Sequence, residues 1–72
     1  MNAPQEMTHE DVLRARLGVF KREHRDLDDA ITALEGALKP DQLTLRRLKK
    51  RKLALKDEIA RLEDELYPDI IA

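Results

Sequence analysis

The chain has no cysteine and no tryptophan, and only one tyrosine, one phenylalanine and two glycines among its 72 residues. Without cysteine, disulfide bonds and thiolate metal sites are excluded. With aromatic residues at 3%, little bulky apolar material is available to enclose a ligand pocket. No segment approaches the roughly 18 consecutive apolar residues that a membrane-spanning helix needs. These scarcities favour a small soluble protein made of long, solvated helices.

The chain also lacks the patterns that carry catalytic or cofactor chemistry. His9 and His24 are far apart in the sequence, and no carboxylate completes a metal-ligand spacing around either of them. There is no glycine-rich phosphate loop and no nucleophile–base pair. Glu58, Glu63 and Glu65 are helix-surface carboxylates without a partner set for acid–base work. We therefore expect no enzymatic activity, no cofactor, no metal and no small-molecule substrate.

Charge and length narrow the class further. The net charge is −1, although 40% of the residues are charged, so no global field attracts nucleic acid or an anionic membrane. The N-terminus has neither a continuous apolar stretch nor a basic flank, so we expect no secretory signal and a cytoplasmic location. A chain of 72 residues makes one domain, of a size at which a single core is marginal and partners commonly help.

Two apolar stripes, each stepping alternately by three and four residues, lie on either side of a breaker segment at residues 36–41. The N-terminal stripe comprises Leu13, Leu17, Phe20, His24, Leu27, Ile31, Leu34 and Leu38. The C-terminal stripe comprises Leu45, Leu48, Lys52, Leu55, Ile59, Leu62 and Leu66. Two helices with such narrow stripes and a short connection can cover each other only by folding back. The predicted fold class is all-α: an antiparallel two-helix hairpin that resembles a coiled coil.

The expected organisation is a flexible N-terminus at 1–7, a helical hairpin at 8–66 and an apolar tail at 67–72. Within the hairpin, helix one covers about 8–38, the turn 36–41, and helix two about 41–66.

Capping residues support these limits. Thr8 is an N-cap candidate, with Asp11 as a weak substitute for the capping-box acid. Gly36 can stop helix one in a left-handed conformation, although Leu38 continues the stripe and the helix could extend to it. Pro40 disfavours helix at the residue before it, and Asp41 can cap helix two. Pro68 ends helix two.

Charges beside the stripes favour the antiparallel orientation. Residues that face each other have numbers that add up to about 79, which places apolar residues opposite apolar residues along most of the seam. Exposed pairs contribute only a few tenths of a kcal/mol each, so they select orientation more than they stabilise. The expected opposite-sign pairs are Arg14 with Glu63, Asp28 with Lys49, and Arg16 with Glu65.

Two polar residues interrupt the stripes. His24 is either a pH-sensitive packing element or, as we favour, a half-buried ring with its polar edge turned outward. Lys52 is expected to extend its ammonium group to water along its aliphatic stem.

The hairpin alone is only marginally stable, because each stripe residue is half covered by a single partner helix. We therefore expect self-association or a protein partner, although single exposed apolar residues are also normal. Further apolar residues outside the stripes include Val12 and Leu43. The candidate partner surface consists of Leu53, Val19, Tyr67, Ile70 and Ile71.

The segment from residue 46 to residue 56 contains seven basic residues and no acid. One interpretation is a stripe on helix two that binds the phosphates of RNA or DNA. The favoured interpretation is a solvated helix face whose basic residues pair with acidic residues of helix one. No aromatic residues that could stack on bases are interspersed in the segment, which argues against nucleic-acid binding. The candidate stripe consists of Arg46, Arg47, Lys49, Lys50, Arg51 and Lys56.

Residues 48–62, LKKRKLALKDEIARL, resemble the signature of the YdcH-like family of small bacterial proteins, a domain of unknown function. The core LKxxKLxLKDEI is complete, and residues 24–31 are similar to the family's HxxLDxxI segment. The resemblance covers roughly residues 14–66; the segments before Val12 and after Leu66 depart from it. It implies a small cytoplasmic helical hairpin of bacterial origin and transfers no catalytic residues.

Together these observations predict a non-catalytic helical hairpin that serves as a protein–protein interaction or self-association module. A nucleic-acid-binding accessory protein that uses residues 46–56 is the alternative.

Overall fold

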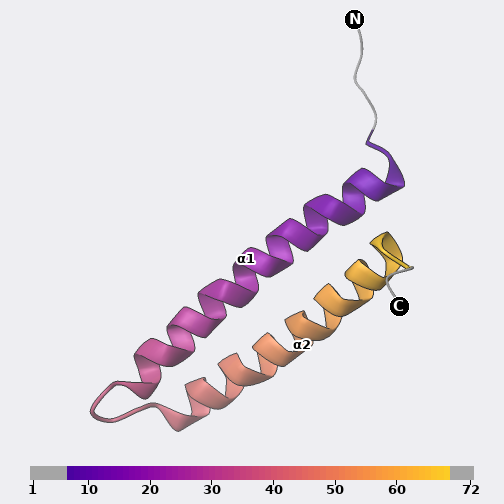
Figure 1. The fold of residues 1–72 in the computed structure, drawn as a ribbon. Coiled ribbons are helices and arrows are strands. Elements are labelled where there is room, and N and C mark those ends of the chain that lie inside the picture. The colour runs from indigo at the N-terminus through magenta and orange to yellow at the C-terminus, as the bar shows by residue number, and fades with distance from the viewer. Residues whose placement is uncertain (1–6, 69–72) are drawn as a thin grey trace, which may run out of the picture.

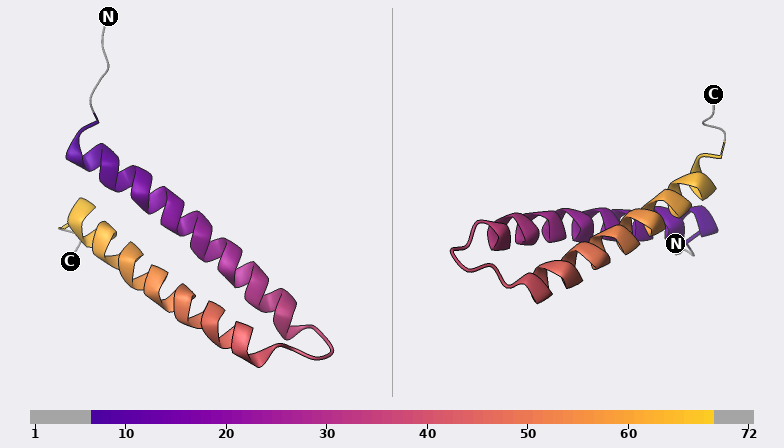
Figure 2. Two further views of the ribbon diagram at one scale, coloured as in Figure 1. Left: turned by 180° about the vertical axis from the view of Figure 1, so that it is seen from behind. Right: turned by 90° about the horizontal axis from the view of Figure 1, so that it is seen from below.

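The computed structural model describes residues 7–68, which form two α-helices joined by a short loop. Helices α1 (His9–Glu35) and α2 (Gln42–Leu66) lie side by side and run in opposite directions, so the start of α1 and the end of α2 meet at one end of the molecule (Figure 1). Seen from below, α2 crosses α1 at an angle (Figure 2). The predicted all-α antiparallel hairpin is confirmed.

Helix α1 begins with a complete capping box. The Asp11 backbone N–H donates to Thr8 Oγ1 at 3.0 Å, and the Thr8 backbone N–H donates to Asp11 Oδ2 at 3.4 Å. Each bond satisfies a donor that the first helical turn would otherwise leave without a partner. Asp11 therefore takes the part that glutamate usually plays in this motif.

Helix α1 ends at Glu35, before the predicted limit at Leu38. Leu38 lies in the loop and is fully exposed, because the apolar stripe of α2 begins only at Leu45 and leaves nothing to cover it. Pro40 also disfavours helix just before it. Gly36 follows the helix with a φ of −84°, so its left-handed freedom is not used there.

Helix α2 is capped by Asp41, as its sequence predicts. The Thr44 backbone N–H donates to Asp41 Oδ1 at 3.1 Å, and the Thr44 hydroxyl donates to Oδ2 at 2.8 Å. These bonds, the backbone one foremost, lower the pKa of the Asp41 carboxyl below its usual value. At the other end, the Tyr67 N–H donates to the Glu63 carbonyl at 2.8 Å, and Pro68 follows.

The core is the seam between the two stripes. Its largest cluster lies at the open end of the hairpin and brings together residues of three predicted facing pairs: Leu13 and Leu66, Leu17 and Leu62, Phe20 and Ile59. Towards the loop, Leu55, Ile31 and Leu45 are also buried. Each buried side chain of residues 7–68 belongs to one of the two stripes. The core is thus one residue layer wide and leaves the outer side of each helix uncovered.

Candidate interaction surfaces

Ion pairs flank the seam on both of its sides. The inter-helix pairs are Lys21 with Glu63 (3.2 Å), Lys49 with Glu35 (3.0 Å), Arg51 with Glu23 (2.8 Å) and Lys52 with Asp28, and His9 Nε2 lies 3.3 Å from Glu65 Oε2. The four lysine and arginine pairs join opposite charges across antiparallel helices. They are largely exposed, so each adds little stability but favours this orientation.

The individual partners differ from those predicted. Glu63 binds Lys21 instead of Arg14, and Arg14 binds Glu10 on its own helix at 3.4 Å. Lys49 likewise binds Glu35 instead of Asp28. Lys21 lies on the same side of α1 as Arg14, two helical turns nearer the loop. Long basic side chains extend along the seam and reach acids further along the facing helix. The prediction that each charge pairs with the residue directly opposite was therefore wrong.

Lys52 and Asp28 form a pair at the middle of the seam. The Lys52 side chain is 33% exposed, and its ammonium group binds Asp28 Oδ1 rather than extending to water alone. This hydrogen bond lowers the pKa of the Asp28 carboxyl below its usual range. The polar residue in the stripe of α2 is thus neutralised by an acid of α1.

His24 is half-buried, but its polar edge is not turned outward. Its Nε2 atom is enclosed and has no hydrogen-bond partner among the described residues. An enclosed polar atom without a partner costs free energy relative to its hydrated state. The expectation of an outward polar edge was therefore wrong for this nitrogen.

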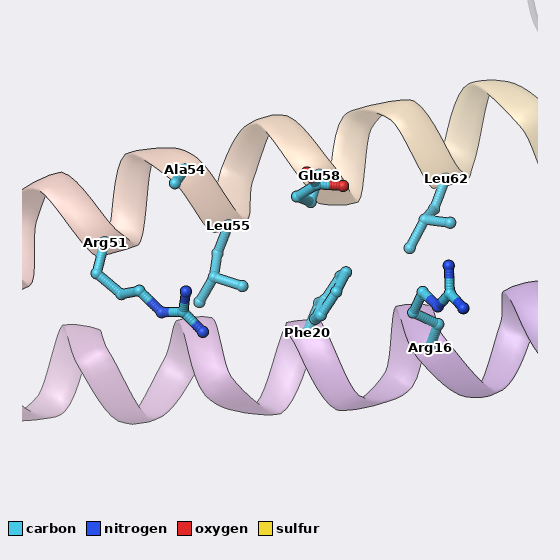
Figure 3. A pocket seen from close by; sticks show the side chains of 7 residues that line it. All are labelled: Arg16, Phe20, Arg51, Ala54, Leu55, Glu58 and Leu62. Atoms are coloured by element: carbon cyan, nitrogen blue, oxygen red, sulfur yellow. The ribbon is translucent and has the colours of Figure 1, made fainter.

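Two shallow grooves follow the seam, one on each side. The first, here the Phe20 groove, has a volume of about 400 Å³ and is lined by Arg16, Phe20, Arg51, Ala54, Leu55, Glu58 and Leu62. Figure 3 shows Phe20 pointing from α1 towards α2, with Leu55 and Leu62 pointing towards α1. The guanidinium groups of Arg16 and Arg51 flank this apolar floor. Arg51 is already held by Glu23.

The second groove, here the Ile31 groove, has a volume of about 390 Å³ and is lined by Asp28, Ile31, Thr32, Glu35, Lys49, Lys52 and Leu53. Its four charged residues are paired with one another, Lys49 with Glu35 and Lys52 with Asp28. Leu53 forms its outer rim and is 62% exposed. This groove therefore presents an apolar edge beside neutralised charges.

The residues of the candidate partner surface do not form one patch. Val19 and Tyr67 are each 48% exposed, and Leu53 is exposed as well. Val19 is nine residues from Asp28, which places it on the opposite side of α1 from the groove that Leu53 lines. Leu53 and Val19 therefore face different directions. Ile70 and Ile71 lie outside the described residues.

The basic residues of α2 are also divided among several sides. Residues four apart in a helix share a side, and consecutive residues are turned by about 100°. Arg46 and Lys50 accordingly lie on one side, Arg47 and Arg51 on a second, and Lys49 on a third, together with Lys56. All six are exposed, and two of them, Lys49 and Arg51, pair with acids of α1. The block is therefore not a single stripe.

The comparison with protein families decides the classification of this hairpin. One family, described as a protein of unknown function (DUF465), matches residues 19–63, which is more than half of the chain. The chain belongs to the DUF465 family. This is the family of small uncharacterised bacterial proteins that includes YdcH, so the resemblance of residues 48–62 is confirmed.

The DUF465 segment includes the loop and both grooves apart from Arg16, and it leaves out part of the open-end core. Leu13, Leu17 and Leu66 lie outside it, yet they belong to the largest buried cluster. Lys52, Leu53, Lys56 and Asp57, which the family motif shares, lie inside it. The hairpin therefore extends beyond the family segment at its open end.

No curated protein and no solved structure matches this DUF465 chain. Between residues 7 and 68, no group of three or more His, Asp or Glu side chains is arranged to hold a metal ion. Neither described helix is long and apolar enough to cross a membrane.

Proposed function

We propose that this DUF465 protein is a non-catalytic cytoplasmic module that acts by binding protein, either a second copy of itself or another partner. The observation that carries the proposal is the exposure of large apolar side chains on α2. Leu43 and Leu53 are 58% and 62% exposed, although the same helix uses its inner side to cover α1. Apolar side chains on both sides of a helix are typical of one that is covered twice.

The thin core supports this proposal. The buried residues form a single layer between two helices, and the most buried, Leu55, keeps 3% of its surface exposed. A chain of this size gains substantially from further burial of apolar surface, because its own core contributes little beyond the cost of ordering the chain. A partner on α2 would supply that burial.

The non-catalytic part of the proposal is supported by the state of the carboxylates that line or border the grooves. Glu58 binds Arg61 at 3.3 Å, and Glu23 binds Arg51. Both grooves are shallow and open along the seam, so neither excludes water from a reacting group. A carboxylate that is held by arginine in open solvent is poorly suited to general acid–base work.

Binding of nucleic acid through residues 46–56 is the second candidate, because Arg46, Arg47, Lys50 and Lys56 are exposed and form no ion pair within residues 7–68. Their division among three sides of α2 weakens it. Salt-dependent retention of a generic RNA that is lost when Lys49, Lys50 and Arg51 are changed to Glu would support this candidate. Absence of retention at low salt would remove it.

The interaction module is tested by a photo-crosslinking amino acid placed at position 53 in cells that express the chain. The matched control places the same amino acid at Arg22, which is nine residues from both Leu13 and Ile31 and hence on the outer side of α1. We expect discrete adducts from position 53 and few from position 22. Adduct-free protein at both positions, or equal labelling of both, would contradict the proposal.

A further inference from the structure

A row of exposed residues runs along the side of α2 that faces away from α1, and one of them, Leu53, also borders the Ile31 groove. Here this row is called the outer stripe, and it consists of Leu43, Arg46, Lys50, Leu53, Asp57, Ala60, Asp64 and Tyr67. Its steps alternate between three and four residues, as a helix-packing stripe requires. Arg46 and Asp64 are each nine residues from Leu55, the most buried residue of α2, so both lie opposite the seam.

The outer stripe contains the large exposed apolar residues of α2 and its C-cap. Within residues 41–68, the large apolar side chains with high exposure are those of Leu43, Leu53 and Tyr67. Leu43 and Tyr67 lie near the two ends of the stripe, and Leu53 lies near its middle. A partner helix lying along α2 would therefore contact apolar side chains at both ends and at the centre.

The charges of the outer stripe are separated by sign along the helix. Arg46 and Lys50 precede Leu53, whereas Asp57 and Asp64 follow it. None of these four forms an ion pair within residues 7–68, in contrast to the paired charges that flank the seam. A partner that runs antiparallel to α2, with acids facing Arg46 and bases facing Asp64, would complement all four charges.

We propose that this partner is a second copy of the chain, docked with its α2 antiparallel along the outer stripe about a twofold axis. The proposal rests on the interaction module above and specifies its occupant. A register that places Arg46 opposite Asp64 of the second copy also places Leu43 opposite Tyr67. The twofold axis then lies on the outer side of α2, level with residue 55 along the helix. The two Leu53 side chains are about 6 Å apart along the helix axis.

The twofold repeats each contact, so one chain supplies both halves of a complementary surface. Lys50 of one copy lies between Asp57 and Asp64 of the other. A parallel twofold pair would instead place Arg46 against Arg46 and Asp64 against Asp64, and these like charges would repel each other. The antiparallel arrangement is therefore the one that places opposite charges next to each other. The resulting dimer has four helices, with the two α1 helices outermost.

The test is a charge exchange, measured by sedimentation equilibrium of the purified chain. We expect a concentration-dependent dimer that Arg46→Asp and Asp64→Arg each weaken by about tenfold, because every reversal acts at two symmetric contacts. The double variant R46D/D64R restores opposite charges across the twofold and should recover most of the affinity. Arg22→Asp, on the outer side of α1, is the control and should leave the dimer unchanged. Circular dichroism checks that each variant keeps its helices.

Two results would overturn this inference. One is a chain that stays monomeric at every concentration. The other is a double variant as weak as either single variant, since that would exclude the proposed register. If position 53 still cross-links to a different protein in cells while the purified chain is monomeric, the interaction module stands and the second copy is excluded. If cross-linking fails as well, both proposals fall.

Discussion

Lys52 of α2 and Asp28 of α1 form an ion pair across the middle of the seam, although only Lys52 belongs to an apolar stripe. The Lys52 side chain is 33% exposed: its aliphatic part lies over the seam, and its ammonium group pairs with Asp28 at the edge of the seam. The hairpin thereby accommodates a cation in its contact layer. The same interaction gives Asp28 a lowered pKa, which makes the pair measurable.

Stability should fall in acid through the two aspartates with lowered pKa, Asp28 and Asp41. Their folded pKa lies below the ordinary value of 3.8, so the stability they contribute is complete above that value and is lost as pH falls through the folded pKa. Thermal melts from neutral pH to strong acid should show this loss below about pH 4.

Two variants separate the contributions. In Lys52→Met, a carboxyl titration followed by NMR should find the pKa of Asp28 raised towards its ordinary value, with Asp41 unchanged. In Asp41→Asn, which keeps a cap but cannot titrate, the fall in stability with acid should be shallower. An Asp28 pKa that does not respond to Lys52→Met would show that the lysine is not its partner in solution.

Replacement of His24 by leucine should stabilise the hairpin. The enclosed Nε2 has no hydrogen-bond partner within residues 7–68, so removing it relieves a desolvation cost of about 1 kcal/mol. Urea unfolding monitored by circular dichroism measures the change. Arg25→Leu, at the exposed neighbouring position, should stay within about 0.5 kcal/mol of the original chain. A less stable His24→Leu would mean that the ring makes a contact worth more than its enclosed nitrogen costs.

Replacement of Gly18 by alanine should also stabilise the hairpin, by about 0.5–1 kcal/mol, because glycine inside a helix costs backbone entropy. A Cβ atom at Gly18 would meet nothing within 4 Å. Gly36→Ala is a useful comparison, since its φ is negative and a Cβ there makes ordinary contacts at 3.7 Å. We expect little change from Gly36→Ala. A large loss there would indicate that the loop needs a left-handed residue after all.

Leu17 and Leu38 provide a matched pair for the extent of the core. Leu17 is buried in the open-end cluster, so Leu17→Ala should cost about 2 kcal/mol or more. Leu38 continues the stripe in sequence but is fully exposed, so Leu38→Ala should change stability by less than about 0.5 kcal/mol. Both changes are read from the same urea transition. Equal losses would show that α1 extends through Leu38 and that its stripe is covered there.

The helix starts and the seam could be predicted because they depend on neighbours in sequence. The hydrogen bonds of Thr8 with Asp11, and of Asp41 with Thr44, join residues within one turn, and an apolar stripe needs only the helical period. The C-terminal end of α1 was harder to predict from the sequence. It depends on where the stripe of α2 begins to cover it, which is a property of the folded pair.

The candidate surface was harder still, because exposure alone does not say which direction a residue faces. Val19 and Leu53 are both exposed apolar residues, yet they lie on different sides of the hairpin. The basic block likewise reads as one feature in sequence, whereas the helix distributes it around α2. Only the position of the seam divides these residues into inner, flanking and outer sets.

By itself the sequence determined two amphipathic helices, their caps and their antiparallel orientation, since these follow from local hydrogen bonding, helical periodicity and the sign of charge along each helix. The tertiary structure decided which charges pair, how Lys52 and His24 are accommodated, and which side of α2 is left uncovered. Those outcomes depend on the crossing of two helices in space, where a lysine side chain can reach an acid two turns from the one that faces it in sequence register.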